Sequence, residues 1–165
     1  MSSGSPESRR SRRTAQKHVV ADEQTLTGGC LCGRVRFEVA GPLGPAGYCH
    51  CTRCQRRTGT AVSPQARIDG SALRIVAGED VVRAYRPSSG FEKLFCAECG
   101  ASLFARNPSD PSQMSVRLGA FDEDPGVRPT WRQYVAYAAE WESIPDDGLP
   151  RFDEGKPGSF NAPAP

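Results

Sequence analysis

The sequence of 165 residues lacks the features that would place it in several large classes of protein. No apolar run approaches the ~20 residues that a membrane-spanning helix requires, and neither an internal repeat nor a sustained helical stripe is present. The N-terminus is polar and rich in arginine, so it lacks the apolar core of a secretory signal. We therefore expect one domain, located in the cytoplasm and without a membrane partner.

Positive charge is concentrated at one end of the chain. Residues 1–20 hold five basic residues and one acidic residue, which leaves the remainder with a net charge of −2. We expect residues 1–22 to form a disordered basic extension, residues 26–154 to form the domain, and residues 155–165, rich in glycine and proline, to form a frayed tail. Nucleic acid is not an expected partner, because the domain itself carries no excess of positive charge.

Seven cysteines are the most informative residues of the sequence. They form three clusters, with the spacings C-x-C, C-x-C-x-x-C and C-x-x-C. An odd number of cysteines in a chain without a secretory signal argues against a disulfide framework and favours metal binding. The spacings typical of ferredoxins do not occur, so zinc is preferred to an iron–sulfur cluster.

Seven thiols divide naturally into a group of four and a group of three. A structural zinc site is closed by four protein ligands, whereas a catalytic site has three and leaves one position open. The early and late pairs could hold a closed structural zinc, and the middle cluster could hold an open catalytic zinc: Cys30, Cys32, Cys96 and Cys99 for the first ion, and Cys49, Cys51 and Cys54 for the second. We thus expect two Zn²⁺ per chain.

An alternative division adds His50 to the second site as its fourth ligand. Neighbouring residues on an extended chain point to opposite faces. If Cys49 and Cys51 face the metal, His50 is therefore expected to face away from it.

The hydrophobic pattern predicts a mainly β domain with many turns and little helix. Alternation of apolar and polar residues predicts several strands, a hairpin at Phe91–Phe104 with a metal-binding turn at its tip, and one helical turn at Arg53–Arg57. Thr27–Gly29 reads as a turn, and Trp131–Trp141 fits either a strand or a short helix. The expected strands are Val35–Val39, Tyr48–Cys51, Ala61–Ile68, Leu73–Ala77, Val81–Tyr85 and Met114–Leu118.

Several residues beside the cysteines are candidates for substrate binding. Arg53, Arg56 and Arg57 follow the middle cluster and could bind a carboxylate of an anionic substrate. Alternatively, they are solvated or donate hydrogen bonds to the zinc thiolates. The aromatic residues Trp131, Tyr134 and Trp141 could form the wall of a pocket or belong to the core.

Three segments together resemble the glutathione-dependent formaldehyde-activating enzyme family. They are Gly-Gly-Cys-Leu-Cys-Gly-Arg-Val-Arg-Phe at 28–37, Cys-His-Cys-Thr-Arg-Cys-Gln-Arg-Arg-Thr-Gly at 49–59, and Phe-Cys-Ala-Glu-Cys-Gly at 95–100. The resemblance implies a β-tent fold of small antiparallel sheets stapled by zinc, and the same division of ligands between two ions. It also implies a carbon–sulfur lyase in which the open zinc helps to join the thiol of glutathione to formaldehyde, giving S-hydroxymethylglutathione.

Two other functions remain open at this point. The same site chemistry could act on another thiol or another aldehyde, because no motif specifies glutathione. The chain could also be a non-catalytic zinc module that binds a partner, an interpretation favoured only by the basic N-terminal segment.

Overall fold

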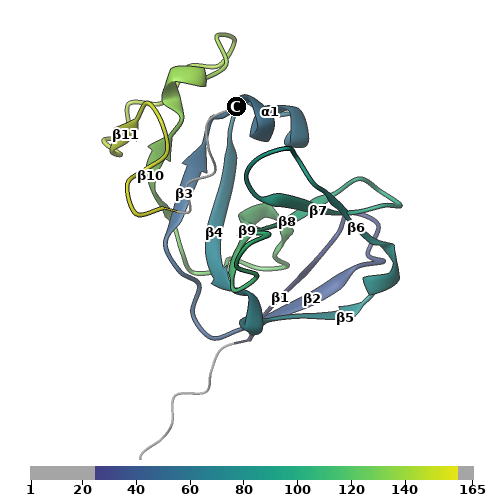
Figure 1. Ribbon diagram of the computed structural model, residues 1–165. Coiled ribbons are helices and arrows are strands. Elements are labelled where there is room, and N and C mark those ends of the chain that lie inside the picture. The colour runs from purple at the N-terminus through teal and green to yellow at the C-terminus, as the bar shows by residue number, and fades with distance from the viewer. Residues whose placement is uncertain (1–24, 160–165) are drawn as a thin grey trace, which may run out of the picture.

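The computed structural model describes residues 25–159, which form two β-sheets with little helix (Figure 1). The smaller sheet has the strand order β1-β2-β5, and the larger has the order β11-β10-β3-β4-β9-β8-β7-β6. The expectation of a mainly β fold is confirmed. The strands are β1 (Thr25–Gly29), β2 (Arg36–Ala40), β3 (Ala46–Cys49), β4 (Ser63–Asp69), β5 (Leu73–Ala77), β6 (Val82–Tyr85), β7 (Glu92–Cys96), β8 (Ser102–Arg106), β9 (Gln113–Arg117), β10 (Pro129–Gln133) and β11 (Arg151–Phe152).

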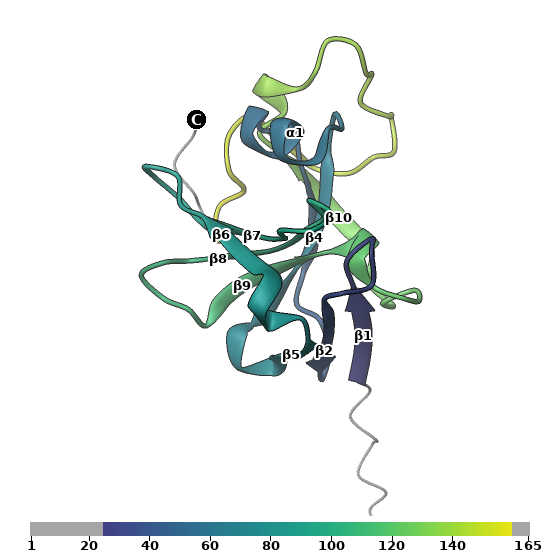
Figure 2. The ribbon, with the colours of Figure 1, turned by 90° about the vertical axis from the view of Figure 1, so that its right-hand side faces the viewer.

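The helical elements within the described range are short. The α-helix α1 covers Thr52–Thr58, and single 3-10 turns lie at Gly70–Ala72, Glu79–Val81, Leu118–Ala120 and Val135–Tyr137. In two views at right angles, α1 lies at one end of the molecule and the small sheet at the other (Figures 1 and 2).

The small sheet is an antiparallel arrangement that begins with a strand where the sequence predicted a turn. Thr27–Gly29 belongs to β1, and Gly28 pairs with Phe37 of β2. A Cβ atom on Gly28 would lie 2.3 Å from the carbonyl oxygen of Ala120 and 2.4 Å from Cζ of Phe37. Glycine is therefore needed here for close packing within a strand, and not for a turn.

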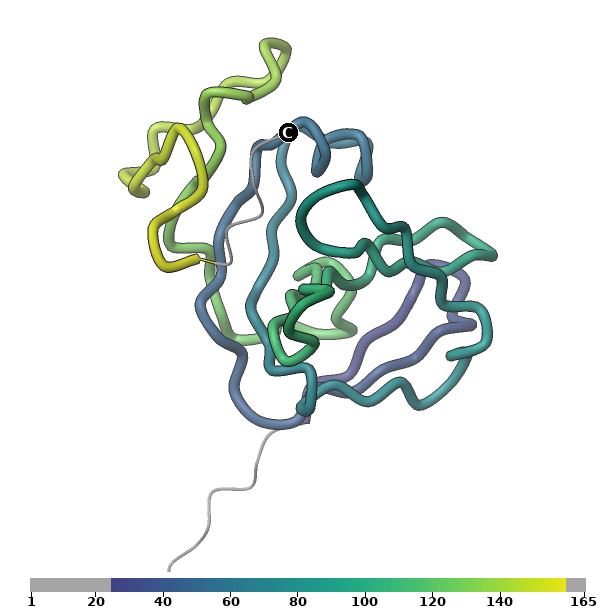
Figure 3. Tube along the Cα trace, in the orientation of Figure 1, coloured from purple at the N-terminus to yellow at the C-terminus, as the bar shows by residue number. Residues whose placement is uncertain are grey.

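The large sheet is antiparallel except at one edge. There β10 runs parallel to both β3 and β11, and the trace places β10 beside β3 (Figure 3). Pro64 pairs with Tyr48 inside β4 and does not interrupt the strand. The segment Trp131–Trp141, ambiguous in the sequence, divides into the end of β10 and a 3-10 turn.

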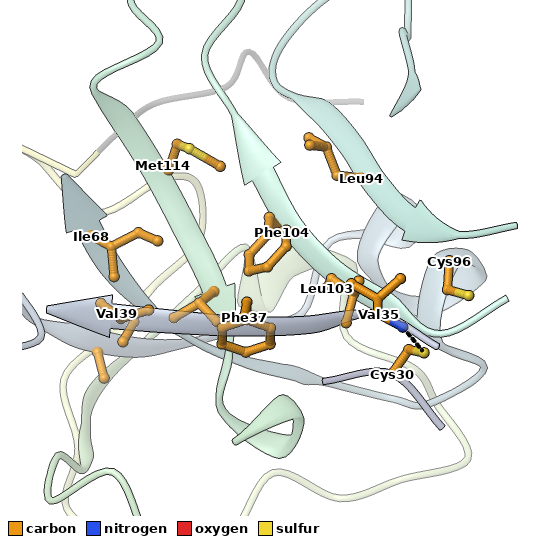
Figure 4. Close-up of a cluster of buried hydrophobic side chains, with 13 residues drawn as sticks. Cys30, Val35, Phe37, Val39, Ile68, Leu94, Cys96, Leu103, Phe104 and Met114 are labelled. Atoms are coloured by element: carbon orange, nitrogen blue, oxygen red, sulfur yellow. Dashed lines mark hydrogen bonds between the residues drawn. The ribbon is translucent and has the colours of Figure 1, made fainter. Parts of the chain in front are cut away.

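The core lies where the small sheet packs against β3, β4, β7, β8 and β9. Val35, just before β2, and Phe37 and Val39 within it point inward and are almost fully buried. The ring of Phe37 meets the edge of the Phe104 ring at a centroid distance of 5.0 Å (Figure 4). Because truncating a buried phenylalanine costs about 3–5 kcal/mol, this pair contributes substantially to holding the two sheets together.

Most of the predicted elements are confirmed, with shifts at their ends. Leu73–Ala77 is β5, the hairpin at Phe91–Phe104 contains β7 and β8, and the helical turn extends to Thr52–Thr58. The strand expected to reach Leu118 ends one residue earlier in a 3-10 turn. Residues 1–22 lie outside the described residues, so the proposed extension and the domain limits stay predictions.

Candidate metal centres and the adjoining cavity

Four cysteine sulfurs come together where the β1–β2 turn meets the β7–β8 turn. All four lie within 4.8 Å of one another. The Sγ atom of Cys32 is 3.5 Å from that of Cys30 and 3.9 Å from that of Cys96. Cys30 and Cys96 are buried at the end of the core (Figure 4), whereas Cys32 is exposed and Cys99 is half-buried. The structure thus brings together the early and late pairs, as the spacing predicted.

The two turns that carry these cysteines have the same local design. Gly33 and Gly100 each follow the second cysteine and adopt a positive φ, 76° and 72° respectively. Their N–H groups donate to the carbonyl oxygens of Cys30 and Cys96, which closes each turn. The N–H of Val35 donates to Sγ of Cys30 at 3.2 Å. A residue with a Cβ atom would be strained at either glycine.

One thiol of this four-cysteine cluster, that of Cys99, is shifted toward the thiolate form that binds metal. Backbone N–H groups of Ala101 and Cys32 donate to the sulfur of Cys99 and lower the pKa of its thiol to about 6. Four sulfurs at about 2.3 Å from a tetrahedral zinc would be roughly 3.8 Å apart. The separations of 3.5 and 3.9 Å come close to that value. The donor set therefore fits a closed zinc site.

Three further cysteines meet at the junction between β3 and α1. Cys49 ends β3, Cys51 caps the helix, and Cys54 lies in its first turn. The Sγ atoms of Cys49 and Cys51 are 3.4 Å apart, and the N–H of Cys54 donates to Sγ of Cys51 at 3.4 Å. All three side chains are buried, and their sulfurs lie within 4.8 Å of one another. Oxygen side chains usually cap helices, and here a sulfur takes that place.

The described residues supply no histidine or carboxylate to this three-cysteine cluster. His50 is buried, but it turns toward β10, where its Nε2 lies 3.4 Å from a guanidinium nitrogen of Arg132. Burial, together with the charges of Arg132 and Arg151, lowers the pKa of His50. The sulfur set fits a zinc ion that has three protein ligands and one open position.

The three cysteines line a cavity of about 80 Å³ that also contains several cations. Arg53 enters it from α1, Lys93 from β7 and Arg117 from β9. Arg117 is buried and donates to Oγ of Ser63 and Oε1 of Gln65, at 2.9 and 2.6 Å. Positive charge is therefore held beside the cysteine sulfurs by elements that are distant in the sequence.

These cations and the cysteines influence one another. Hydrogen bonds from Cys49 and Cys51, with the charges of Arg117 and Lys93, hold the pKa of Cys54 well below its ordinary value. Burial lowers the pKa of Lys93, although the negative charge of Cys54 opposes this effect. A thiolate within this cluster is thus stabilised before any ion is considered, and the thiolate is the form that binds metal.

The three candidate arginines occupy different positions. Arg53 lines the cavity, where its guanidinium also donates to the carbonyl oxygen and Oγ of Ser89. Arg57 donates to the carbonyl oxygens of Leu94 and Phe104, so it connects α1 to β7 and β8. Arg56 is exposed. Arg56 and Arg57 do not line the cavity at the cysteines but a neighbouring pocket.

Several cavity residues were not singled out from the sequence. Lys93 and Arg117 lie in strands next to apolar residues. The alternation of side chains between the two faces of a strand is the signal that could have identified them. Lys93 lies between the buried residues Glu92 and Leu94, so it points to the other face of β7. Arg117 follows Val116 of the core in the same way. Of the aromatic candidates, Trp131 and Tyr134 line the cavity, whereas Trp141 is 71% exposed.

The fold and these two sites define a class of small, mainly β proteins in which two groups of cysteine sulfurs could each hold a metal ion, zinc being consistent with the donors. The model of the family named glutathione-dependent formaldehyde-activating enzyme matches residues 25–137. The chain therefore belongs to that family. In residues 25–159, the helices are too short to cross a membrane.

One relative carries the name of this family, and one solved structure has a similar fold. A protein of Halomonas elongata, provisionally named a glutathione-dependent formaldehyde-activating enzyme, is 30% identical over 106 residues, which are 60% of this chain and 67% of that protein. A crystal structure of a Rhodobacter sphaeroides protein is similar with a TM-score of 0.51 and 26% identity, over 77% of this chain and 99% of that one.

Proposed function

We propose that residues 26–154 form a zinc-dependent enzyme of the carbon–sulfur lyase class, which adds the thiol of glutathione to formaldehyde. The observation that supports this most directly is the group of three buried sulfurs, without a fourth donor among the described residues, at a cavity lined by cations. The family name supplies the two substrates. A cytoplasmic location fits this proposal, because thiols stay reduced there.

Cys49, Cys51 and Cys54 would hold the catalytic zinc in this enzyme, and the four-cysteine cluster would hold a structural zinc. When bound, zinc supplies a Lewis acid that keeps a thiol in its thiolate form. The reaction joins the sulfur of RSH to the carbon of formaldehyde, and the thiol proton ends on the new hydroxyl group of RS–CH₂–OH. No electron is gained or lost, so the reaction requires no redox cofactor.

The protein side chains contribute charge and position. Lys93 and Arg117 place positive charge at the cavity wall, where it favours an incoming thiolate and the oxygen of a carbonyl group as negative charge develops there. Ser63 and Gln65 hold the guanidinium of Arg117 in place. Trp131 and Tyr134 cover part of the cavity and limit the access of water.

The alternative of a non-catalytic zinc module depends on the basic segment 1–20, which lies outside the described residues. The related alternative, an enzyme for another thiol or aldehyde, shares the site and differs only in substrate. A comparison of substrates therefore decides between the two enzymatic readings, and a test for any catalysis decides between enzyme and module.

The proposed activity can be tested with zinc-loaded protein, glutathione and ¹³C-formaldehyde. Exchange NMR measures how fast hydrated formaldehyde and S-hydroxymethylglutathione interconvert. We expect the protein to accelerate exchange by at least about tenfold, and Cys54→Ser to remove the acceleration. Arg83→Gln is the matched control, since Arg83 is exposed on β6 and lines neither pocket. Exchange at the protein-free rate would contradict the proposal.

A further inference from the structure

A second pocket adjoins the cavity and shares two residues with it. Arg53 and Lys93 line both. The second pocket has a volume of about 500 Å³, which falls within the ~300–1,000 Å³ of typical small-molecule sites, whereas the cavity at the cysteines is much smaller. We call it the basic pocket, and it lies between α1 and the β6–β7 hairpin. Its main lining residues are Arg53, Arg56, Arg57, Tyr85, Lys93 and Phe95.

The positive charge of the basic pocket is not balanced by carboxylates. Seven arginines elsewhere, such as Arg106 and Arg132, form ion pairs with aspartate or glutamate. Within residues 25–159, no ion pair is formed by the four cations of the pocket, and no acidic residue lines it. Four cations without carboxylate partners among the described residues, gathered in one concave surface, are complementary to an anion.

The cysteine thiolates do not account for this charge. Three thiolates and one divalent ion sum to −1, which a single neighbouring cation would balance, and Arg117 already lies there. Arg56 does not line the cavity at all. The positive charge that remains is therefore available to an anionic group bound in the basic pocket itself.

Two of the four cations of the pocket are also held in place. Ser89 fixes Arg53 through two hydrogen bonds, and the carbonyl oxygens of Leu94 and Phe104 fix Arg57. Little side-chain entropy is then lost when an anion binds. Tyr85 and Phe95 add apolar surface beside the charges.

We propose that the basic pocket is a second substrate subsite, which binds a carboxylate remote from the thiol while the sulfur lies at the three cysteines. This proposal rests on the proposed function. It makes the preferred substrates thiols that carry an anionic group several bonds from the sulfur. Arg53 and Lys93 line both the cavity and the basic pocket, so the part of the substrate between its thiol and its carboxylate would pass beside them.

The test compares a thiol that has remote carboxylates with one that has none. The exchange assay gives KM and kcat for glutathione and for 2-mercaptoethanol, using zinc-loaded wild type, Arg56→Gln and the control Arg83→Gln. We expect Arg56→Gln to raise KM for glutathione about five- to tenfold, with kcat and the KM for 2-mercaptoethanol changed less than about twofold. Arg56→Lys should restore part of the affinity. Equal effects on both thiols, or no effect, would overturn the subsite.

A binding measurement separates this proposal from the catalytic one. S-methylglutathione retains both carboxylates but cannot react, and calorimetry measures its affinity for wild type and for Arg56→Gln. Weaker binding by Arg56→Gln supports the subsite even if wild type accelerates no exchange, in which case only the proposed reaction fails. Equal binding by the two proteins, or no binding by wild type, overturns the subsite whatever the exchange assay shows.

Discussion

The two cysteine clusters use the same ligand atom in different settings. In the four-cysteine cluster, Cys32 and Cys96 approach each other across 64 positions of sequence and join two hairpins. In the three-cysteine cluster, all sulfurs come from one short segment at the end of β3 and the start of α1. A metal bound in the first arrangement would constrain the fold, whereas a metal bound in the second would leave the fold largely unchanged, with a cavity beside it.

One strand serves both clusters. The side chains of β7 alternate between its two faces, so Leu94 and Cys96 point to the core and the four-cysteine cluster. Lys93 and Phe95 point the other way, and both line the basic pocket. A substitution at one residue of β7 therefore affects one site, and a substitution at the next residue affects the other.

The largest expected effect is the loss of the fold when the four-cysteine cluster is broken. Cys96 is fully buried, and structural zinc binding contributes directly to folding free energy. Cys96→Ser should abolish the cooperative thermal transition followed by circular dichroism. A melting temperature within about 3 °C of wild type would show that this cluster is not what holds the hairpins together.

The matching substitution in the three-cysteine cluster should separate activity from folding. Cys54→Ser removes a proposed ligand of the open site but leaves the two sheets untouched. We expect zinc to fall from two ions to one by elemental analysis, acceleration of exchange to disappear, and the melting temperature to drop by less than about 5 °C. Unfolding as severe as that of Cys96→Ser would break the distinction between the clusters.

A smaller effect is expected from Gly28, which positions the strand leading to Cys30. An added Cβ would approach the carbonyl oxygen of Ala120 to 2.3 Å, so Gly28→Ala should cost about 1–3 kcal/mol in urea unfolding. Gly119→Ala is the control, because a Cβ there meets nothing within 4 Å. Equal stability of the two variants would contradict the packing described for β1.

The smallest effect concerns the far end of β7. Glu92 is buried, and its ion pairs with Arg106 and Arg86 lower its pKa. Because the folded pKa is lowered, the carboxylate contributes its full stability above its ordinary pKa and loses it as the pH falls through the folded value. Glu92→Gln should cost about 1–2 kcal/mol at pH 7.

The pH dependence of the stability of Glu92→Gln tests whether the charged form of the Glu92 carboxylate stabilises the fold. The difference in unfolding free energy between wild type and Glu92→Gln, measured in urea from pH 7 downward, should shrink as the pH enters the acidic range. A difference that stays constant or grows on acidification would contradict the assigned role of the ion pairs.

The spacing within each cysteine cluster is local information, whereas the joining of the early pair with the late pair was predicted from the division of seven thiols into four and three ligands. The turn before Gly100, the short helix that follows Cys51, and the outward position of His50 depend on neighbours in the chain. These features are determined within a few residues, so pattern and stereochemistry suffice to predict them.

The surroundings of the open site could not be predicted in the same way. Lys93 and Arg117 reach the cavity only because β7 and β9 join one sheet with β3 and β4. Arg57, expected beside the substrate, lines the basic pocket, and one of its nitrogens also donates to the carbonyl oxygens of Leu94 in β7 and Phe104 in β8. Such contacts depend on strand order, and no local pattern specified the parallel pairing of β10 with β3.

The most direct test of the account is the zinc content of wild-type protein during mild chelation, followed together with circular dichroism. If one cluster is closed and structural and the other open, the protein should hold two zinc ions, lose one early without change in the spectrum, and lose the second only as it unfolds. Two ions released together with unfolding, or a single ion that never rises to two on adding zinc, would contradict it.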